Sequence, residues 1–380
     1  MSSIFPYIPS VGALIGDGIR AMAQTTSQAP TPPPTHLPPR DAPANQNDIA
    51  TALKGVFDGQ PEVTTHARFS SVSITLNNGK GLDIDNAAKL ISSTPPTGVA
   101  TSLRGIEILN SATAKTVGEK NGLASSGLVP VWLENHGSIT GKNGAGVKLD
   151  GQQDDEVINA GLIAGSQGLA LDLGGGNDVL IVKNGGRFEG SVDGGSGTNQ
   201  VILDDTQGGH FDGASQMQHL WVSSGTWTLT GAVAANQQGS VYSGATLINQ
   251  SKIGGSMTVE PGATYAGGTV TNLDVAGTLQ LDPAAHIEND LHMQKGSNLA
   301  FSLNPLKVGN TAHLDGATLS IQIDNENDPR LSQPLSIIDA KQIDGQFSGV
   351  TSNLKTLTPE LTYSPGGVFV TFKRNEPTAA

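Results

Sequence analysis

The sequence predicts an all-β protein: a right-handed parallel β-helix with a β-rich C-terminal cap and a disordered, proline-rich N-terminus. One phrase, Asn-x-Gly-x-apolar-x-Gly, begins at Asn135, Asn159 and Asn184, so its copies start 24 and 25 residues apart. Apolar residues alternate within each period, and Gly and Asn interrupt them every few residues. A fixed period of about 20 to 50 residues is typical of repeat architectures, and Gly and Asn permit the tight corners that short strands need.

A second phrase repeats in the same register. It reads Val-Lys-Leu-Asp-Gly at residues 147–151 and Leu-Asp-Leu-Gly-Gly at residues 171–175. This alternation is that of a strand with one buried face. A leucine-rich repeat would show Leu-x-x-Leu-x-Leu, and a propeller would need blades of about 40 residues. Residues 71–298 leave room for roughly ten coils stacked about 4.8 Å apart, with a shorter Gly-Ala-Thr-apolar phrase at Gly244 and Gly262.

Composition excludes several classes of function. The formal charge of −13 argues against nucleic acid and against anionic lipid, both of which attract basic surfaces. The chain has no cysteine, which excludes disulfides, zinc-thiolate sites and cysteine nucleophiles. No apolar run approaches the roughly 18 residues of a membrane-spanning helix. Aromatic residues make up only 4%, which favours a narrow core of aliphatic side chains.

Residues 1–47 are predicted to form a leader followed by a proline-rich disordered segment. An Ala-Met-Ala cleavage site at residues 21–23 follows an apolar run at residues 11–15, as in a signal peptide. However, no Lys or Arg precedes Arg20, and Asp17 interrupts the apolar region. The other interpretation is an uncleaved leader, because the early serines and the absence of acidic residues before Asp17 resemble type III secreted effectors.

The proline-rich stretch is expected to be extended. Seven prolines lie between Pro30 and Pro43, which favours polyproline II and excludes helix. The stretch is either a semi-rigid tether or a docking site for a proline-binding module. Residues 48–57 are predicted to form a short amphipathic helix that caps the first coil, whose unpaired strand edge would otherwise be open to aggregation.

The rest of the chain divides into a β-helix and a cap. We expect the β-helix to span residues 48–298, with regular coils over residues 131–205 and a protruding loop at residues 92–98. Residues 299–374 contain longer alternating strands separated by Pro and Gly turns, which predicts a hairpin-rich cap. Residues 375–380 are expected to be a tail.

Several phrases resemble the passenger domains of bacterial autotransporters of the pertactin-like type V secretion family. The stretch Ala-Leu-Asp-Leu-Gly-Gly-Gly-Asn-Asp-Val-Leu at residues 170–180 is similar to a phrase common in those passengers. Residues 334–340, 345–347, 361–363 and 368–372 resemble their C-terminal autochaperone region. This resemblance implies a cap that closes the β-helix and nucleates its folding at the cell surface.

Family members continue into a linker helix and a twelve-stranded outer-membrane barrel. This sequence lacks the many further ten-residue alternating strands that such a barrel needs, so we expect the barrel to be absent from this chain. The resemblance then implies either a passenger without its anchor or a passenger-like protein secreted by another route.

Two phrases partly fit the calcium-binding nonapeptide Gly-Gly-x-Gly-x-Asp-x-apolar-x. One lies at residues 173–181 and includes Asp178, and the other, at residues 194–199, carries Asn199 in place of the aspartate. Calcium needs several oxygen ligands from tandem copies nine residues apart, whereas these copies are 21 residues apart. We therefore predict glycine-rich coil corners and neither a metal nor a cofactor.

Some polysaccharide lyases and hydrolases are also β-helices, so an enzyme is an alternative. The candidate acids are the Asp-Asp-Glu run at residues 154–156 and the Asp pair at residues 204–205, with His210 nearby. Neighbouring residues of a strand face opposite ways, so we interpret these runs as solvated turns. His136 stands where the other copies of the phrase carry Ala and Gly, which indicates a tolerated residue. The sequence has no Gly-x-Ser-x-Gly nucleophile motif.

Trp221 and Trp227 are expected to alternate in one strand with Thr and Val. They would form either a sugar-stacking platform or part of a wide core, and we favour the core.

The sequence therefore predicts a non-enzymatic exported protein of a Gram-negative bacterium, secreted or at the cell surface, that uses its long polar surface for adhesion or host interaction. Its expected partner is a host surface protein or glycan, and not nucleic acid. The alternatives are a type III secreted effector or scaffold and a β-helix polysaccharide lyase or hydrolase.

Overall fold

The protein is a parallel β-solenoid of about ten turns, as the repeats predict. The computed structural model describes residues 62–66, 71–76, 79–80, 82–83, 105–233 and 238–375, which all belong to one compact unit, Pro38–Ala380. The leader, the proline-rich segment, the helix at residues 48–57, the loop at residues 92–98 and residues 376–380 lie outside the described residues. Among the described residues, no helix is long and apolar enough to cross a membrane.

The strands are short and numerous, as the frequent Gly and Asn predict. Those of the N-terminal coils are β1 (Glu62–His66), β2 (Ser71–Leu76), β3 (Gly79–Lys80), β4 (Leu82–Asp83), β5 (Gly105–Asn110), β6 (Lys115–Gly118), β7 (Leu123–Ser125), β8 (Val131–Asn135), β9 (Ser138–Gly141), β10 (Val147–Leu149), β11 (Glu156–Asn159), β12 (Leu162–Asp172), β13 (Val179–Val182) and β14 (Arg187–Asp193). Those of the middle coils are β15 (Gln200–Asp204), β16 (Gly209–Phe211), β17 (His219–Ser224), β18 (Thr226–Leu229), β19 (Gln238–Val241), β20 (Thr246–Asn249), β21 (Lys252–Val259), β22 (Thr264–Val275) and β23 (Thr278–Ile287). The C-terminal elements are β24 (Leu291–Met293), β25 (Asn298–Phe301), β26 (Leu306–Val308), β27 (Thr311–His313), β28 (Thr318–Ile321), the 3-10 helix η2 (Pro329–Ser332), β29 (Leu335–Asp339), β30 (Gln342–Asp344), β31 (Gly349–Ser352), β32 (Leu357–Ser364) and β33 (Gly367–Arg374).

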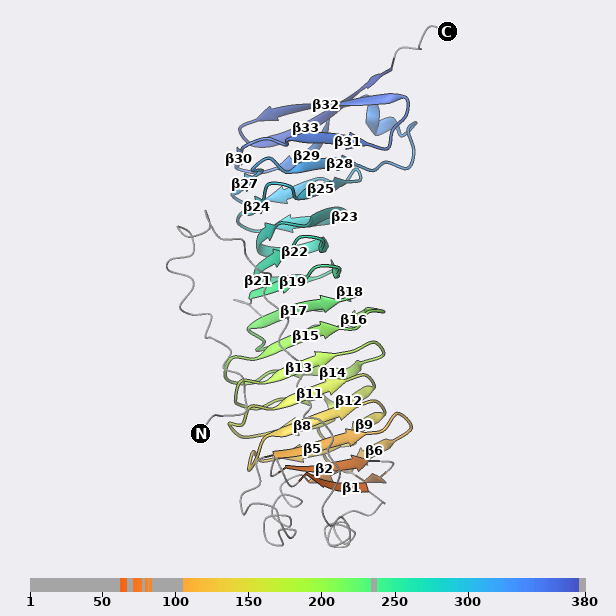
Figure 1. The fold of residues 1–380 in the computed structure, drawn as a ribbon, viewed down its shortest axis with the longest axis vertical. Helices are drawn as coiled ribbons and strands as arrows, with labels where there is room; N and C mark the ends of the chain where they lie inside the picture. The colour runs from red at the N-terminus through yellow and green to blue at the C-terminus, as the bar shows by residue number, and fades with distance from the viewer. Residues whose placement is uncertain are drawn as a thin grey trace. The chain divides into compact units, whose positions relative to one another are not determined.

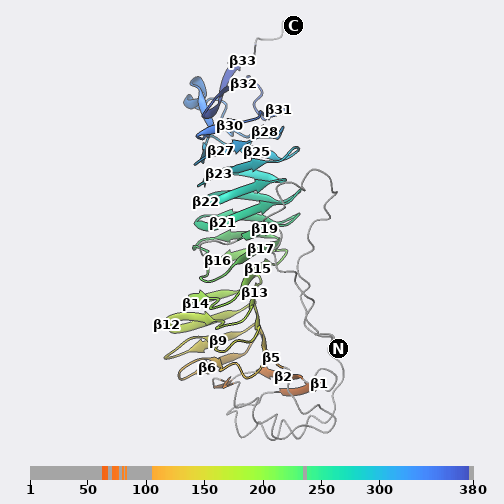
Figure 2. The ribbon, with the colours of Figure 1, turned by 90° about the vertical axis from the view of Figure 1, so that its left-hand side faces the viewer.

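The strands pair in two sheets (Figures 1 and 2). The larger sheet contains β5, β8, β11, β13, β15, β17 and the later strands, and the smaller contains β3, β4, β6, β7, β9, β10, β12 and β14. The smaller sheet ends at β14, and the strands from β16 onward belong to the larger sheet. The N-terminal coils are therefore longer: Asn110 pairs with Asn135, 25 residues on, whereas Val259 pairs with Val275, 16 residues on.

The core is a narrow stack of aliphatic side chains. Along the larger sheet, Leu133, Val157, Leu180, Val201 and Leu220 occupy equivalent positions in five successive coils, and each is at most 1% exposed. Successive residues of a strand point to opposite faces, so the residues on either side of these point outward or into the corners. The prediction of a narrow aliphatic core is confirmed.

The C-terminal region contains both kinds of strand pairing. Parallel pairing continues through β31, because Leu319 of β28 pairs with Val350. Antiparallel pairing begins where β29 meets β33, and β32 and β33 form a hairpin over Leu357–Ser364 and Gly367–Arg374. Val368 and Val370 of β33 are completely buried and join the core of the coils. The hairpin thus covers the last coils with apolar side chains.

Candidate functional site

A ladder of asparagines lies at the corner that follows β5, β8 and β11. Nδ2 of Asn110 donates to Oδ1 of Asn135 (2.7 Å), and Nδ2 of Asn135 donates to Oδ1 of Asn159 (2.8 Å). The amides of Asn110 and Asn135 also donate to the backbone carbonyls of Ser138 and Leu162. All three asparagines are completely buried. Because an unpaired buried amide is costly, these contacts hold the coils together, and the repeated Asn has a structural role.

The third copy of the phrase does not join this ladder. Asn159 pairs with Val182, whereas Asn184 is exposed. Leu162 pairs with Arg187, so the corner between the paired strands contains two more residues in this coil than in the one before. The expectation of an equivalent asparagine is wrong here, because the added residues move Asn184 out of the corner.

The glycine-rich phrases form stacked coil corners. Gly174 and Gly195 both have positive φ, at 82° and 71°, which glycine adopts without strain. A Cβ built on Gly195 would lie 1.7 Å from the carbonyl oxygen of Gly174. Close backbone contact between coils therefore accounts for glycine at this position. Within the part of the chain that the structure describes, no group of three or more His, Cys, Asp or Glu side chains could hold a metal ion.

The acidic run at residues 154–156 is only partly exposed. Asp154 is exposed and accepts a hydrogen bond from the backbone N of Asn177 (2.7 Å). Asp155, however, is only 3% exposed, and its Oδ1 accepts from the backbone N of Val131 (2.7 Å). Burial raises the pKa of Asp155 to about 8. The interpretation of the run as a solvated turn is wrong for Asp155, because its side chain turns inward to reach the preceding coil. It is also wrong for Glu156, which begins β11 and has a buried Oε1.

Asp178 and Asn199, the residues of the calcium-like phrases, occupy the same corner in the next two coils. Oδ1 of Asp178 accepts from the backbone N of Asp155 (2.8 Å), and Oδ1 of Asn199 accepts from the backbone N of Asp178 (2.9 Å). The backbone N of Asn199 donates to Oε1 of Gln218 (2.6 Å). We call Asp155, Asp178, Asn199 and Gln218 the corner ladder. Its side-chain oxygens bind backbone amides of neighbouring coils.

The other candidate acids do not converge with these. Oδ2 of Asp204 lies 2.5 Å from Nζ of Lys183, and its Oδ1 accepts from the hydroxyls of Ser223 and Ser224. Although burial acts to raise it, hydrogen bonds from these three groups hold the pKa of Asp204 below its usual range. His210, by contrast, is exposed. Asp204 is therefore an ion-paired residue at the end of β15, so the interpretation as a solvated turn is wrong for it, whereas Asp205 accepts from the backbone N of Asn184 and of Gln207.

His136 also lies on the surface. Its Nε2 is 2.6 Å from Oε1 of Glu134, and the imidazole is 41% exposed. In the equivalent place the next coil carries Ala160. This position therefore tolerates different side chains, as the repeat indicates.

One column of side chains runs along the outer face of the larger sheet. The registers place one residue from each coil in line, and in the coils that contain the corner ladder this residue stands three positions after the ladder residue. The column begins with apolar side chains, passes through small polar ones and ends with acids and histidines. We call it the outer column, and its members are Ile158, Ile181, Ile202, Trp221, Ser240, Thr258, Asp274, His292, His313 and Asp344.

The first part of the outer column is apolar and aromatic. Ile158, Ile181 and Ile202 form a cluster separate from the core, against which Trp221 packs. The ring of Trp221 stacks on His219, with centroids 5.3 Å apart and planes within 9°. Burial lowers the pKa of His219, so its imidazole is neutral at pH 7. Sequence reasoning missed this grouping, because it depends on the register of coils about 20 residues apart.

The two tryptophans do not share a strand. Trp221 belongs to β17 (His219–Ser224), whereas Trp227 belongs to β18 (Thr226–Leu229), and Gly225 with φ of 75° turns the chain between them. Trp227 is completely buried in the core, as predicted, whereas Trp221 lies on the outer face. The shared-strand prediction is wrong because Gly225 forms a corner.

The last part of the outer column carries acids and histidines. Nε2 of His292 lies 2.5 Å from Oδ2 of Asp315, and Nδ1 of His292 lies 3.5 Å from Oδ1 of Asp274. Nδ1 of His313 lies 2.8 Å from Oδ2 of Asp344. The two imidazoles meet edge to face, with centroids 6.1 Å apart. These side chains are 30–59% exposed, so they are available to a ligand.

No protein-family model matches the chain, and no curated protein matches it at a significant level. The function is therefore inferred from the fold and from the placement of the side chains.

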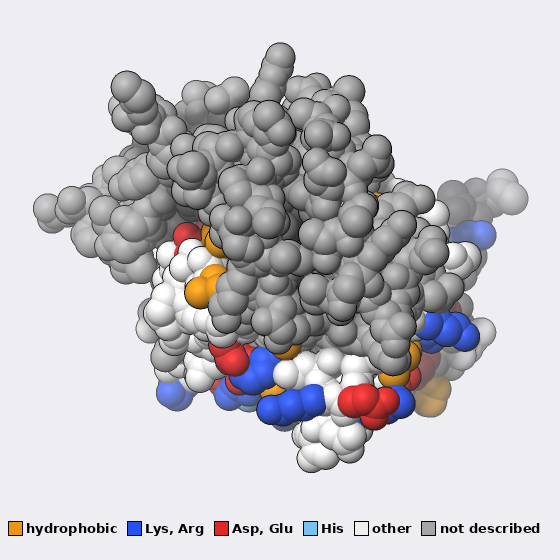
Figure 3. Space-filling view, turned by 90° about the horizontal axis from the view of Figure 1, so that it is seen from below, with side chains coloured by type: hydrophobic (Ala, Val, Ile, Leu, Met, Phe, Trp, Pro, Cys, Tyr) orange, Lys and Arg blue, Asp and Glu red, His pale blue; other side chains and the backbone are white. Residues whose placement is uncertain are grey.

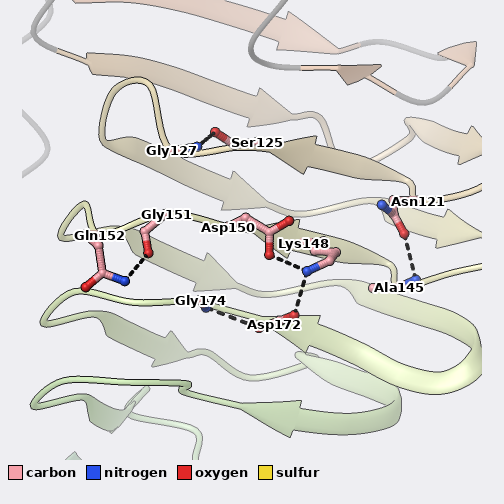
Figure 4. Close-up of polar contacts among 10 residues, drawn as sticks. All are labelled: Asn121, Ser125, Gly127, Ala145, Lys148, Asp150, Gly151, Gln152, Asp172 and Gly174. Carbon is pink, nitrogen blue, oxygen red and sulfur yellow. Dashed lines mark hydrogen bonds and ion pairs between the residues drawn. The ribbon is translucent and has the colours of Figure 1, made fainter.

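On the side of the smaller sheet, the outer surface of the N-terminal coils carries side chains of both charges. In Figure 4, Lys148 lies between Asp150 and Asp172 on successive coils; its Nζ is 3.2 Å from Oδ2 of Asp172. Lys142 similarly pairs with Glu119 at 2.6 Å. Figure 3 shows basic and acidic side chains next to one another on the described surface visible from this end. Although the formal charge of the chain is −13, this surface carries basic side chains, and they pair with neighbouring acids.

Proposed function

We propose that this chain is a non-enzymatic, exported solenoid that binds a host surface glycan or protein, in the manner of an autotransporter passenger. The outer column is the proposed binding face. The observation that carries the proposal is the aromatic group on that face, where Trp221 stacks on a neutral His219. Flat aromatic rings bind the apolar faces of sugars, and their polar edges donate hydrogen bonds.

The neighbouring side chains suit a polar ligand. Nε1 of Trp221 is held by Oε1 of Gln200 (3.1 Å), which orients the indole, and Tyr242 lies next to it with centroids 6.1 Å apart. Further along the same column, His292 and His313 with their partner acids supply donors and acceptors. Adhesion to a repetitive glycan fits a face that extends over many coils.

The placement of the acids supports binding in preference to catalysis. Glycoside hydrolysis uses two carboxyls that flank the scissile bond. In the corner ladder, Oδ1 of Asp155 and Oδ1 of Asp178 each accept from a backbone amide, and both residues are at most 3% exposed. Such carboxyls are inaccessible to a polysaccharide.

Replacing Trp221 by alanine is expected to lower binding to immobilised host-cell glycans by at least tenfold, since stacking contributes about 1.4 kcal/mol or more in a binding site. Binding would be measured on a glycan array and then by titration with the best glycan. The matched control is Trp132→Ala, which removes a tryptophan from the same outer face in another coil, where Trp132 pairs with Glu156. Equal binding by the Trp221 variant and the natural protein would contradict the proposed face.

Fractionation of the producing cell tests the proposed export. We expect the chain outside the cytoplasm, either cleaved after Ala23 and present in the periplasm or uncleaved in the medium. The first result supports a passenger-like route, whereas release that requires an intact type III system supports the effector route. A chain confined to the cytoplasm would contradict export by both routes and with it the role in host interaction.

A further inference from the structure

The corner ladder contains a carboxyl oxygen with no hydrogen-bond partner. Oδ1 of Asp178 accepts from the backbone N of Asp155, but Oδ2 of Asp178 is buried without a partner. The whole residue is 0% exposed. A buried, ionised and unpaired carboxylate oxygen is far costlier than a neutral group, so the protonation state of Asp178 matters to the stability of this corner.

The next coil shows which kind of atom this place accommodates. Asn199 occupies the equivalent position, and its Oδ1 is used in the same way, to accept from the backbone N of Asp178. Its other atom, Nδ2, is a donor: it donates to the carbonyl oxygen of Gly194 (2.7 Å) and to that of Gln216 (3.1 Å). The position that Oδ2 occupies in Asp178 is therefore occupied in Asn199 by Nδ2, a hydrogen-bond donor.

The coil register extends this comparison to the backbone. Gly175 pairs with Ser196, 21 residues on, the same interval that separates Asp178 from Asn199. The same interval relates Leu173 to Gly194. The carbonyl of Leu173 therefore corresponds to the carbonyl of Gly194, which accepts a hydrogen bond from Nδ2 of Asn199. An aspartate can donate at this place only when Oδ2 carries a proton.

We propose that Asp155 and Asp178 form a proton-dependent latch between successive coils: the stacked coils hold these carboxyls protonated, and their ionisation loosens the corner. This latch is independent of the proposed binding face. Folding of the coils is therefore accompanied by the uptake of protons at neutral pH.

The charges around the latch favour protonation. The carboxylates that act on Asp155 are those of Asp178 and Asp154, and Asp154 also acts on Asp178. Burial, followed by these like charges, raises the pKa of Asp155 to about 8 and that of Asp178 to about 7, although a backbone hydrogen bond lowers each. No basic side chain contributes to either shift among the described residues.

A third acid must be separated from the latch in any experiment. Glu156 belongs to β11 (Glu156–Asn159), and its Oε1 is buried without a partner. Burial, with a contribution from Glu134, raises its pKa to about 7. Glu156 lies two residues before Ile158 in the same strand, so its side chain points to the outer face, away from the corner ladder.

The sign of the pH effect follows from these directions. The folded latch keeps protons that the unfolded chain releases above its ordinary carboxyl pKa of about 4. The protein is therefore expected to lose stability as pH rises from about 5 to about 8. Each carboxyl that stays protonated raises the unfolding equilibrium constant about tenfold per pH unit across this window. Above pH 8 the loss levels off.

The test compares urea unfolding of the full chain between pH 5 and pH 9 for four proteins. The natural protein should lose stability with rising pH. In Asp178→Asn the unfolding equilibrium constant should rise about tenfold less per pH unit, because the asparagine amide donates a hydrogen bond without having to take up a proton. Asn199→Asp adds a third carboxyl to the corner ladder and should steepen the loss. Glu156→Gln is the control, because it removes only the pH dependence of stability that Glu156 contributes on the outer face.

A second measurement does not depend on unfolding. Infrared spectra of the folded protein at pH 6 should contain the C=O stretch of protonated carboxyl groups, and this band should weaken in Asp178→Asn. An unchanged band in that variant, or a pH dependence equal to that of the natural protein, would overturn the latch. So would a loss of pH dependence in Glu156→Gln alone.

Discussion

Replacement of Asn135 by alanine is expected to lower the free energy of unfolding by about 3 kcal/mol. The Asn135 side chain takes part in three hydrogen bonds: with Asn110 (2.7 Å), with Asn159 (2.8 Å) and with the carbonyl of Leu162 (3.2 Å). Each buried hydrogen bond contributes on the order of 1 kcal/mol. The cost is largest in the middle of the ladder, since alanine there removes a partner from the coil on either side.

The control for this variant comes from the same phrase. Asn184→Ala changes the asparagine of the third copy, which is exposed and lies outside the ladder. We expect this change to alter the free energy of unfolding by less than about 0.5 kcal/mol, as for most surface substitutions. Urea unfolding of both variants provides the comparison, and similar effects would show that the ladder does not stabilise the coils.

The class of fold could be predicted because it depends on local patterns. Alternation of apolar residues defines a strand with one buried face, and the repeated spacing brings equivalent residues into line. The short Gly-Ala-Thr phrases show this well, since Leu247 of one phrase pairs with Tyr265 of the next. Both side chains are completely buried. Periodicity alone was sufficient for these positions.

The corners could not be predicted to the same degree. A shift of one residue in the backbone reverses the direction of a side chain. Whether an acid such as Asp155 faces solvent or the neighbouring coil therefore depends on the exact length and conformation of the corner. Asn184 shows the same limit, because two added residues in the corner move it outward while the following Phe188 still pairs with Ile163. Burial of a corner residue is thus a property of the stacked coils.

The outer column illustrates a longer-range limit. Trp221 and Ile202 come together only because β17 pairs with β15 in a particular register, in which residues 19 positions apart are neighbours. Coil length changes along the chain, from 25 residues at Asn110 to 16 at Val259. A column of side chains therefore cannot be traced by adding a fixed period to the sequence.

Replacement of Trp227 by alanine is expected to lower the free energy of unfolding by about 4 kcal/mol, the largest effect predicted for a single residue. Trp227 is the largest fully buried side chain among the described residues, and its Nε1 donates to the carbonyl of Ser224 (2.9 Å). Its ring lies over Gly209, where a Cβ would come within 2.8 Å of it. Alanine would leave a cavity that the coils above and below cannot fill, and truncation of a core tryptophan typically costs about 3–5 kcal/mol.

The comparison with Trp221→Ala separates the two roles assigned to tryptophan in this chain. Trp221 lies on the outer face, packed against a small apolar cluster and only partly buried, so its loss should cost about 1 kcal/mol of stability, as for the partial burial of an aromatic ring. Binding should respond in the opposite order, with the larger loss for Trp221→Ala. If urea unfolding showed equal destabilisation by the two variants, Trp221 would be a core residue, and the outer column would lose the aromatic ring on which its proposed role in binding depends.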